Sequence, residues 1–269
     1  MVAAGLSETE RKRFDNLVFH DEGHGYDAFG LQREFVAFGR LLTSPFYDKW
    51  FRVQSSGHEH IPSAGPGVIV CNHSGAVPFD GAMVWTDIVR KSEPPRVARP
   101  VADHFVPMIP VIGTVFARGG MVGGSRGNAR ALLEHGELLL IFPEGVPGIA
   151  KHFSQRYQLQ EWRVGHAELA IRNSAPVIPA AVIGAEEQMP QIGRIPIAMM
   201  GLPFIPITLT PFPLPVRYHI LYGPPVPIPE LYRPEMADDP AAVREAAGRT
   251  RAAVEALIER GLAERKGIF

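Results

Sequence analysis

Three groups of polar residues lie at, or next to, segments that the sequence predicts to be buried. They are Asn72-His73 with Asp80, then Arg118, then Glu144-Gly145. Burying a polar or charged side chain costs free energy unless the side chain finds a partner, so this placement needs a reason. A histidine beside a carboxylate is the usual arrangement of a general base, because the carboxylate fixes the tautomer and stabilises the imidazolium. His73 and Asp80 are therefore candidate catalytic residues.

The spacing between His73 and Asp80 limits how they could meet. Seven positions correspond to about 10 Å along a straight helix, so the two side chains could not touch across a helical segment. Gly75 and Pro78 instead favour a loop that folds back and brings them together. A histidine and an aspartate at this spacing are more often ordinary polar residues, so the spacing alone does not establish a pair.

The sequence places no enzyme nucleophile beside this histidine. There is no Gly-x-Ser-x-Gly motif, and the single cysteine, Cys71, lies inside a predicted strand where a buried, unreactive thiol is expected. The simplest chemistry is then direct attack by a substrate hydroxyl that His73 deprotonates, without a covalent enzyme intermediate.

Strands and helices alternate along the segments that must position these residues. Such alternation predicts an α/β domain with a mixed, mostly parallel sheet flanked by helices, whose ligands gather at the carboxyl ends of strands. A last helix is expected to start with Asp239 as N-cap and Pro240 in its first position. Strands are predicted at residues 67–71, 96–98, 138–142 and 176–183, and helices at residues 82–90, 128–135 and 163–171.

Two apolar segments could contact lipid. Residues 31–42 have helical apolar periodicity, Pro45 is predicted to end that helix, and an aromatic and basic cluster follows over residues 46–52. This pattern suits a membrane interface, and it equally suits packing on the main domain. Residues 195–216 carry six prolines, which exclude a spanning helix and predict an extended or looped segment, either packed or touching lipid.

Composition excludes several classes of protein. The chain has 269 residues, 46% of them hydrophobic and 20% charged, which indicates a globular fold rather than a disordered one. The net charge of -1 gives no reason to expect nucleic acid as a partner, and one cysteine allows no internal disulfide. The first 15 residues are polar, so no secretory signal is expected. We also expect no metal, because no spaced cluster of histidine and cysteine is present.

Four blocks in order resemble the glycerolipid acyltransferase superfamily. They are residues 72–75 with Asp80-Gly81, residues 113–118, residues 141–145 and residues 177–180. Each block alone is a weak signal, whereas four in sequence at plausible intervals are a strong one. The resemblance covers roughly residues 55–225, and it implies an O-acyltransferase on a single α/β domain.

The resemblance also implies a role for each matching position. His73 would be the general base and Asp80 its orienting carboxylate. Arg118 would contact a phosphate or another polar head of the acceptor, as a guanidinium does well. Glu144 and Gly145 would shape the acceptor pocket. The remaining positions of the first block, expected to line the substrate site, are Asn72, Ser74 and Gly75.

The partners follow from the same resemblance, whereas the expected location rests on the two apolar segments. The donor implied is acyl-coenzyme A or an acyl carrier protein, used as co-substrate, with a lipid-like alcohol as acceptor and no bound cofactor. Residues 55–269 would form the acyltransferase domain, ending in a C-terminal helix, and residues 1–54 an N-terminal segment with an amphipathic helix. We expect a peripheral or monotopic protein on the cytoplasmic face of a membrane, held by residues 31–51 and 195–216.

Two departures from the family pattern bear on the acceptor. Six residues separate His73 from Asp80 where four are usual, and the third block continues as Val146-Pro147-Gly148 rather than Thr-Arg-Ser. Both features resemble the branch with monoacylglycerol and diacylglycerol acyltransferases and their bacterial relatives, which favours a neutral acceptor over lysophosphatidate. Two alternatives stay open: a hydrolase that uses the same pair on water, and a non-catalytic lipid-binding protein.

A basic stretch follows the third block. Lys151, His152, Arg156 and Arg163 could face phosphates of the carrier or an anionic headgroup, although a solvated surface is the default expectation for such residues. The glycine-rich residues 119–127 lack the pattern of a phosphate-binding loop and are expected to form a flexible turn.

Overall fold

A seven-stranded sheet forms the centre of the computed structural model, which describes residues 6–75, 77–103, 105–199 and 202–269. Neighbouring strands follow the order β1-β9-β6-β2-β5-β3-β4, and every pair is parallel except β6 with β9. The strands are β1 (Gln54–Ser56), β2 (Gly67–Cys71), β3 (Ala98–Ala102), β4 (Val122–Gly123), β5 (Leu138–Ile141), β6 (Val177–Ile183) and β9 (His219–Tyr222).

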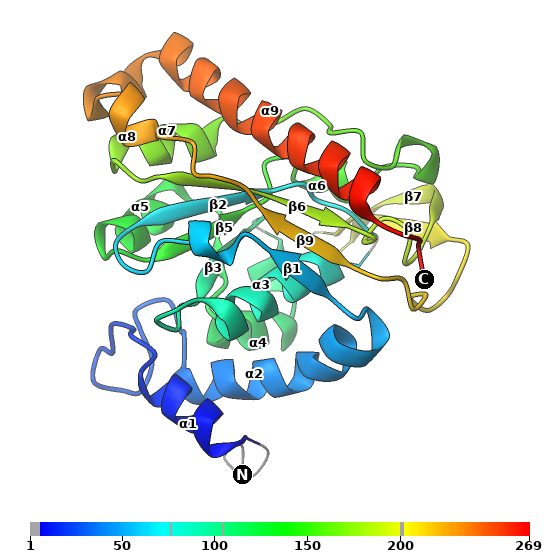
Figure 1. Ribbon diagram of the computed structural model, residues 1–269, viewed down its shortest axis with the longest axis horizontal. Coiled ribbons are helices and arrows are strands. Elements are labelled where there is room, and N and C mark those ends of the chain that lie inside the picture. Colours follow the sequence, from blue (N-terminus) through cyan, green and yellow to red (C-terminus); the bar gives the residue numbers. More distant parts are fainter. Residues whose placement is uncertain (1–5, 76, 104, 200–201) are drawn as a thin grey trace.

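Helices cover both faces of this sheet (Figure 1). One face packs against α5 (Arg126–Glu134), α7 (Gly165–Arg172) and α9 (Pro240–Glu264), with Val68 and Val70 of β2 in that core. The opposite face packs against α3 (Phe79–Lys91), with Ile69 and Cys71 of β2 in the second core. Because alternate residues of a strand point to opposite faces, an uninterrupted apolar strand such as β2 requires a helix layer on each side.

The predicted fold class is confirmed: a mixed, mostly parallel sheet lies between helices in a single domain. The expected start of the last helix is also confirmed, since Asp239 caps α9 by accepting a hydrogen bond from the backbone N–H of Ala241 at 2.8 Å. The shorter elements are α4 (Ile112–Arg118), α6 (Val146–Ile149), α8 (Ile228–Leu231), the 3₁₀-helices His58–His60, Val106–Met108, Phe153–Gln155 and Pro234–Asp238, and the π-helix Phe46–Trp50.

The N-terminal segment lies against α3 on the lower side of the sheet in Figure 1. Its helices are α1 (Glu8–Asp15) and α2 (Arg33–Pro45), and Val36 of α2 shares a buried cluster with Trp85 of α3. The prediction that Pro45 ends the α-helix is confirmed, since α2 ends at this residue. Pro45 keeps helical backbone angles, and the chain continues as a π-helix closed by a bond from the N–H of Phe51 to the carbonyl of Phe46.

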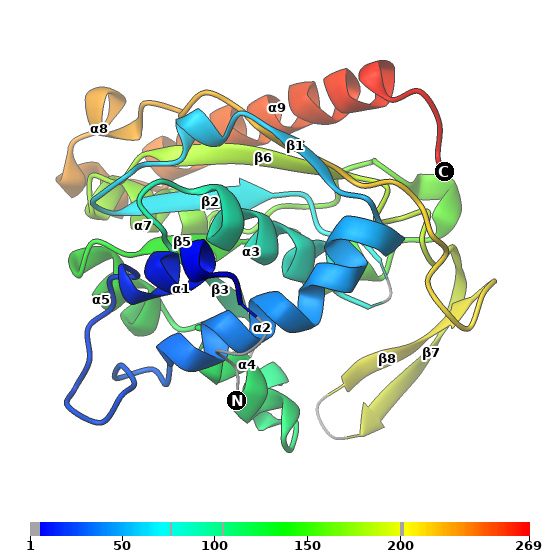
Figure 2. The ribbon, with the colours of Figure 1, turned by 60° about the horizontal axis from the view of Figure 1, so that its bottom comes forward.

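Strands β7 (Gln191–Met199) and β8 (Leu202–Thr208) pair antiparallel in a separate two-stranded hairpin. Figure 2 shows this hairpin extending away from the main sheet. The expected extended conformation of residues 195–216 is therefore confirmed over these strands, while residues 200 and 201 lie outside the described residues. Across the described ranges, no helix combines the length and the apolar character needed to cross a membrane.

Candidate active site

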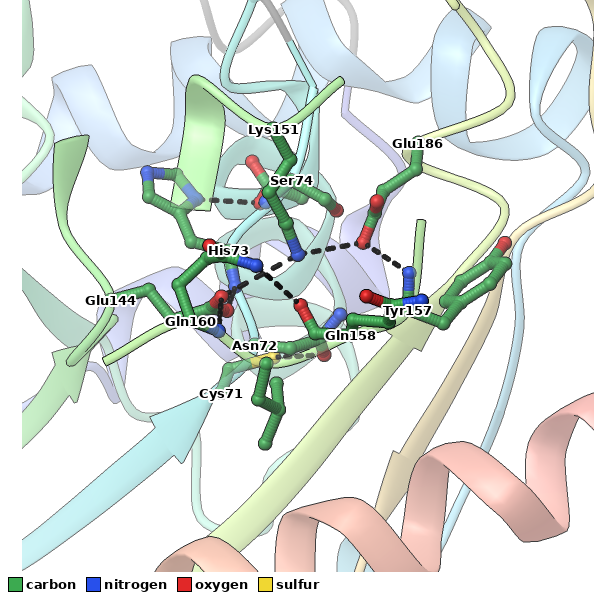
Figure 3. A network of polar contacts seen from close by, with 12 residues as sticks. Cys71, Asn72, His73, Ser74, Glu144, Lys151, Tyr157, Gln158, Gln160 and Glu186 are labelled. Atoms are coloured by element: carbon green, nitrogen blue, oxygen red, sulfur yellow. Dashed lines mark hydrogen bonds and ion pairs between the residues drawn. The ribbon is translucent and has the colours of Figure 1, made fainter. Parts of the chain in front are cut away.

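The candidate site lies at the carboxyl ends of two neighbouring strands. Asn72 and His73 follow β2, and Glu144 and Gly145 follow β5 by a few residues. Strands β2 and β5 are parallel, so the segments that leave them emerge at the same edge of the sheet. Figure 3 shows the polar side chains from both segments gathered there.

His73 and Asp80 are in direct contact. The Nδ1 atom of His73 lies 2.7 Å from the Oδ2 atom of Asp80, which also accepts the backbone N–H of Ser74 at 2.8 Å. The other oxygen of Asp80 accepts the backbone N–H of Gly81 at 2.8 Å. These bonds satisfy a carboxylate that is fully buried in the first turn of α3, where the helix dipole also favours negative charge.

The returning loop predicted from Gly75 is confirmed. Gly75 has φ +92°, and a Cβ atom at this position would lie 2.9 Å from the Nε2 atom of Gln188. Both facts favour glycine here, because other residues rarely adopt this backbone and would collide with Gln188. The expectation that α3 begins at residue 82 is wrong by three residues, since Phe79 starts the helix and carries Asp80 into its first turn.

The ring of His73 is held in one orientation and reaches the surface. Its Nδ1 atom donates to the carboxylate of Asp80, which leaves a lone pair on Nε2 to receive a proton. The ring stacks on Phe142 with centroids 4.3 Å apart and an interplanar angle of 28°. The His73 side chain is 15% exposed, so a substrate can approach it from solvent.

Glu144 holds the backbone of His73. Its Oε1 atom accepts the N–H of His73 at 2.9 Å, and its Oε2 atom accepts the N–H of Gln160 at 2.8 Å. The Glu144 side chain is fully buried, and the Nζ atom of Lys151 lies 3.5 Å from Oε2. Glu144 thus connects the segment after β5 to the one after β2 (Figure 3).

The remaining residues of the first block serve the backbone around His73. The side-chain amide of Asn72 accepts the N–H of Val182 at 2.8 Å and donates to its carbonyl at 3.1 Å, which extends the pairing of β2 with β6. Ser74 is buried, and its hydroxyl has no hydrogen-bond partner among the described residues. Substrate contacts for Asn72, Ser74 and Gly75 stay predictions.

Gly145 and Arg118 lie in different surroundings. Gly145 has φ +54°, and a Cβ atom here would lie 3.3 Å from the guanidinium carbon of Arg163. Arg118 ends α4, its guanidinium carbon is 4.6 Å from the ring centroid of Tyr26, and its carbonyl accepts the N–H of Gln32. The acceptor role of Arg118 stays a prediction, and in this structure the residue joins α4 to the N-terminal segment.

Two residues of the site were not identified from the sequence. Lys151, expected on a solvated face, has a side chain that is only 3% exposed and forms an ion pair with Glu186 at 2.9 Å. Gly148 approaches His73 so closely that a Cβ atom on it would lie 3.0 Å from the Cβ of His73. The one sequence signal for Lys151 is its apolar surroundings, since Ile149 and Ala150 precede it.

Two further features concern this edge of the sheet: the thiol of Cys71 and the possible presence of a metal site. Cys71 is fully buried as predicted, and burial raises the pKa of its thiol well above its usual range, as expected for an unreactive thiol. Within the part of the chain that the structure describes, no group of three or more His, Cys, Asp or Glu side chains could hold a metal ion.

The chain is similar to several known proteins. The family model described as "Acyltransferase" matches residues 52–183. An uncharacterized protein of Mycobacterium tuberculosis is 36% identical over 258 residues, covering 91% of this chain and 72% of that protein. The bovine (Bos taurus) "DGAT1/2-independent enzyme synthesizing storage lipids" is 31% identical over 219 residues, covering 78% of this chain and 60% of that protein.

One solved structure has the same fold. The 1-acyl-sn-glycerophosphate (LPA) acyltransferase PlsC from Thermotoga maritima matches with a TM-score of 0.57 over 87% of this chain and 80% of that chain. Sequence identity between the two is 17%, so this match shows a common fold and nothing about the acceptor.

Proposed function

The chain belongs to the glycerolipid acyltransferase superfamily, and from that membership we propose that His73 is the general base of its acyl transfer. The observation that carries the proposal is the contact of 2.7 Å between His73 Nδ1 and Asp80 Oδ2. This contact fixes the tautomer that leaves Nε2 free to accept a proton, and it stabilises the imidazolium that forms.

The reaction proceeds without an acyl-enzyme. A hydroxyl of the lipid acceptor gives its proton to His73 Nε2 while its oxygen forms a bond to the carbonyl carbon of the acyl thioester. The carbon–sulfur bond then breaks, and the leaving thiolate takes the proton from the imidazolium of His73. The products are an ester and a free thiol, and the donor is acyl-coenzyme A or an acyl carrier protein. The buried, unreactive thiol of Cys71 supports this direct route.

We propose a neutral glycerolipid or another long-chain alcohol as the acceptor. The bovine relative is named as an enzyme that synthesizes storage lipids, and the third block of this chain lacks the Thr-Arg-Ser continuation. An acceptor screen with one labelled acyl-coenzyme A tests this, comparing lysophospholipids, monoacylglycerol, diacylglycerol and long-chain alcohols. Transfer only to lysophospholipids would contradict the neutral acceptor and leave the transferase proposal intact.

Substitution of the base tests the role of His73. His73→Ala should lower kcat by a factor on the order of 10² or more, because general-base catalysis contributes that much. An unchanged kcat would exclude His73 as base. If the label appeared only as free fatty acid whatever alcohol was offered, the enzyme would be a hydrolase using the same pair on water.

We further propose that the protein binds the cytoplasmic face of a membrane peripherally. Phe38, Leu42, Phe46 and Trp50 recur every four residues on the exposed side of α2 and its π-helix. This stripe supports a lipid contact because apolar helix faces with tryptophan at one end are typical of membrane interfaces.

The hairpin β7–β8 adds a second apolar surface beside that stripe. Ile195 and Ile205 are paired across the hairpin and are 50% and 47% exposed. The indole N–H of Trp50 donates to the carbonyl of Pro213 at 3.2 Å, which links the end of the stripe to the segment after the hairpin. Flotation with liposomes tests the proposal: Leu42→Ser with Ile205→Ser should reduce the bound fraction. A wild-type protein that stays at the bottom at every lipid composition would refute it.

A further inference from the structure

Lys151 lies inside the network that holds His73, although it lies 78 residues after it. Its ammonium group forms an ion pair with Glu186 at 2.9 Å and lies 3.5 Å from Glu144. All three side chains are buried, at 3%, 6% and 0% exposure. A lysine is rarely buried to this degree unless its charge is required, so the contact with Glu144 needs an explanation.

Resting on the general-base function proposed above, we propose that Lys151 is a positioning residue, which holds the Glu144 carboxylate in place so that Glu144 holds the backbone of His73. An ionised carboxylate has two accepting oxygens, and both are used here, for the N–H groups of His73 and Gln160. The position of the Glu144 carboxylate therefore determines whether the backbone at His73 is held.

Lys151 provides a cation between two buried carboxylates, those of Glu144 and Glu186. Burial disfavours an ionised carboxylate, and Glu186 adds a second carboxylate to the same network. Burial and the neighbouring Glu144 raise the pKa of Glu186, while Lys151 and the N–H of Tyr157 act in the opposite direction. Without Lys151, the two buried carboxylates would repel each other with no cation between them, and the Glu144 side chain would move away from its position beside His73.

Among the described residues, Lys151 provides the only cation that forms a salt bridge with Glu144 or Glu186. Tyr157 lies on the far side of Glu186 and its N–H donates to the same Glu186 oxygen at 3.1 Å. Arg163 is 65% exposed and pairs with Asp103 instead. Gly75, Gly148, Lys151 and Glu186 are among the residues that line a small cavity beside the site.

A double-mutant cycle between Lys151 and Glu144 tests the proposal. Lys151→Met should lower kcat about 10- to 100-fold, because a catalytic base that shifts by up to about 1 Å loses that much rate. The KM for the acyl donor should change less than about threefold. In a Glu144→Gln background, the same substitution should lower kcat less than about threefold, because the carboxylate through which Lys151 acts is already gone. An undiminished effect in that background would overturn the proposal. The Glu144→Gln protein keeps the Lys151–Glu186 pair, so this single variant serves as a folded reference if Lys151→Met on its own folds poorly.

Hydrogen exchange of single backbone amides gives a readout that does not depend on activity. Lys151→Met should speed exchange of the His73 amide at least about tenfold, while the Ser74 amide, held by Asp80, should keep its rate. Equal acceleration at both amides would indicate general loosening and refute a positioning role. Selective acceleration together with an active His73→Ala variant would uphold the role of Lys151 and reject His73 as base.

A buried ion pair elsewhere provides the matched control. Arg99 and Asp27 pair at 2.7 Å with side chains that are 0% and 6% exposed, and Arg99 lies in β3 rather than after a strand end. Asp27→Asn should lower stability as Lys151→Met does, yet leave kcat per folded molecule within about twofold. Lys151→Arg, which keeps the charge, should recover part of the lost kcat. If Lys151→Met behaved like Asp27→Asn in kcat, Lys151 would be a structural residue only.

Discussion

Gly148 offers a direct way to move the proposed base without touching its chemistry. A Cβ atom at Gly148 would lie 2.8 Å from the Cβ of Glu144, 3.0 Å from the Cβ of His73 and 3.1 Å from the His73 carbonyl oxygen. Carbon atoms in ordinary contact are about 3.5–4.0 Å apart, so Gly148→Ala requires a shift of roughly 0.7 Å. Because the contacts are with atoms close to the backbone, rotation of a side chain cannot relieve them.

The size of the effect on catalysis follows from this shift. Misplacing a catalytic group by about 1 Å can cost 10²-fold in rate, so kcat should fall about 10- to 100-fold. Overpacking should also cost about 1–3 kcal/mol of stability. The assay is transfer of labelled acyl groups from acyl-coenzyme A to the best acceptor of the screen, with kcat normalised to the folded fraction from a denaturation curve.

Gly248 is the matched control for the same substitution. It lies on the exposed side of α9, and a Cβ atom there would meet no atom within 4 Å. Gly248→Ala should leave kcat unchanged and stabilise the helix by about 0.5–1 kcal/mol. A folded Gly148→Ala enzyme with the kcat of the wild type would show that the packing of Gly148 on His73 and Glu144 does not position the base.

Three further substitutions have expected outcomes. Asn72→Ala should cost about 1–3 kcal/mol in urea unfolding, because it leaves the N–H and carbonyl of Val182 without partners. Burial lowers the pKa of His166 to about 4. Between pH 6.5 and 4, the imidazole of His166 therefore binds a proton in the unfolded chain and not in the folded protein. The free energy of unfolding consequently falls as the pH decreases through that window. His166→Gln should remove about 2 kcal/mol of the loss between pH 6.5 and 5, measured by denaturation at each pH. Asp239→Ala should cost about 1 kcal/mol, seen as a lower Tm, through loss of the α9 cap. A Tm equal to that of the wild type would contradict the cap.

The central strands and the last helix could be predicted because their signals are local. Strands β2, β5 and β6 are continuous apolar runs of four to seven residues, and the cap of α9 needs only Asp239 and Pro240. Strands β1 and β9 gave no such signal. Gln54–Ser56 is three polar residues at a sheet edge, and its pairing with His219–Tyr222 joins segments more than 160 residues apart.

The candidate site was predictable where one loop carries it. His73, Gly75 and Asp80 are neighbours in sequence, so a single turn brings the imidazole to the carboxylate. The environment of Lys151 depends instead on Glu186, which is 35 residues later and follows β6, whereas Lys151 follows β5, on the other side of β2 in the sheet. Burial of a charged side chain requires a partner, and a partner supplied by another strand cannot be read from the local sequence.

The third block continues as Val146-Pro147-Gly148 where the family usually has Thr-Arg-Ser, and this difference affects the position of His73 as well as the choice of acceptor. Glu144 accepts hydrogen bonds from two backbone N–H groups and pairs with Lys151, which follows this segment. Val146-Pro147-Gly148 instead forms a short helix whose glycine packs on His73 and whose end leads to Lys151. Because one short segment provides both the close packing and the charge, we expect substitutions at Gly148 and Lys151 to affect the same hydrogen bond at His73. The two sites should then show less than additive losses of kcat when combined.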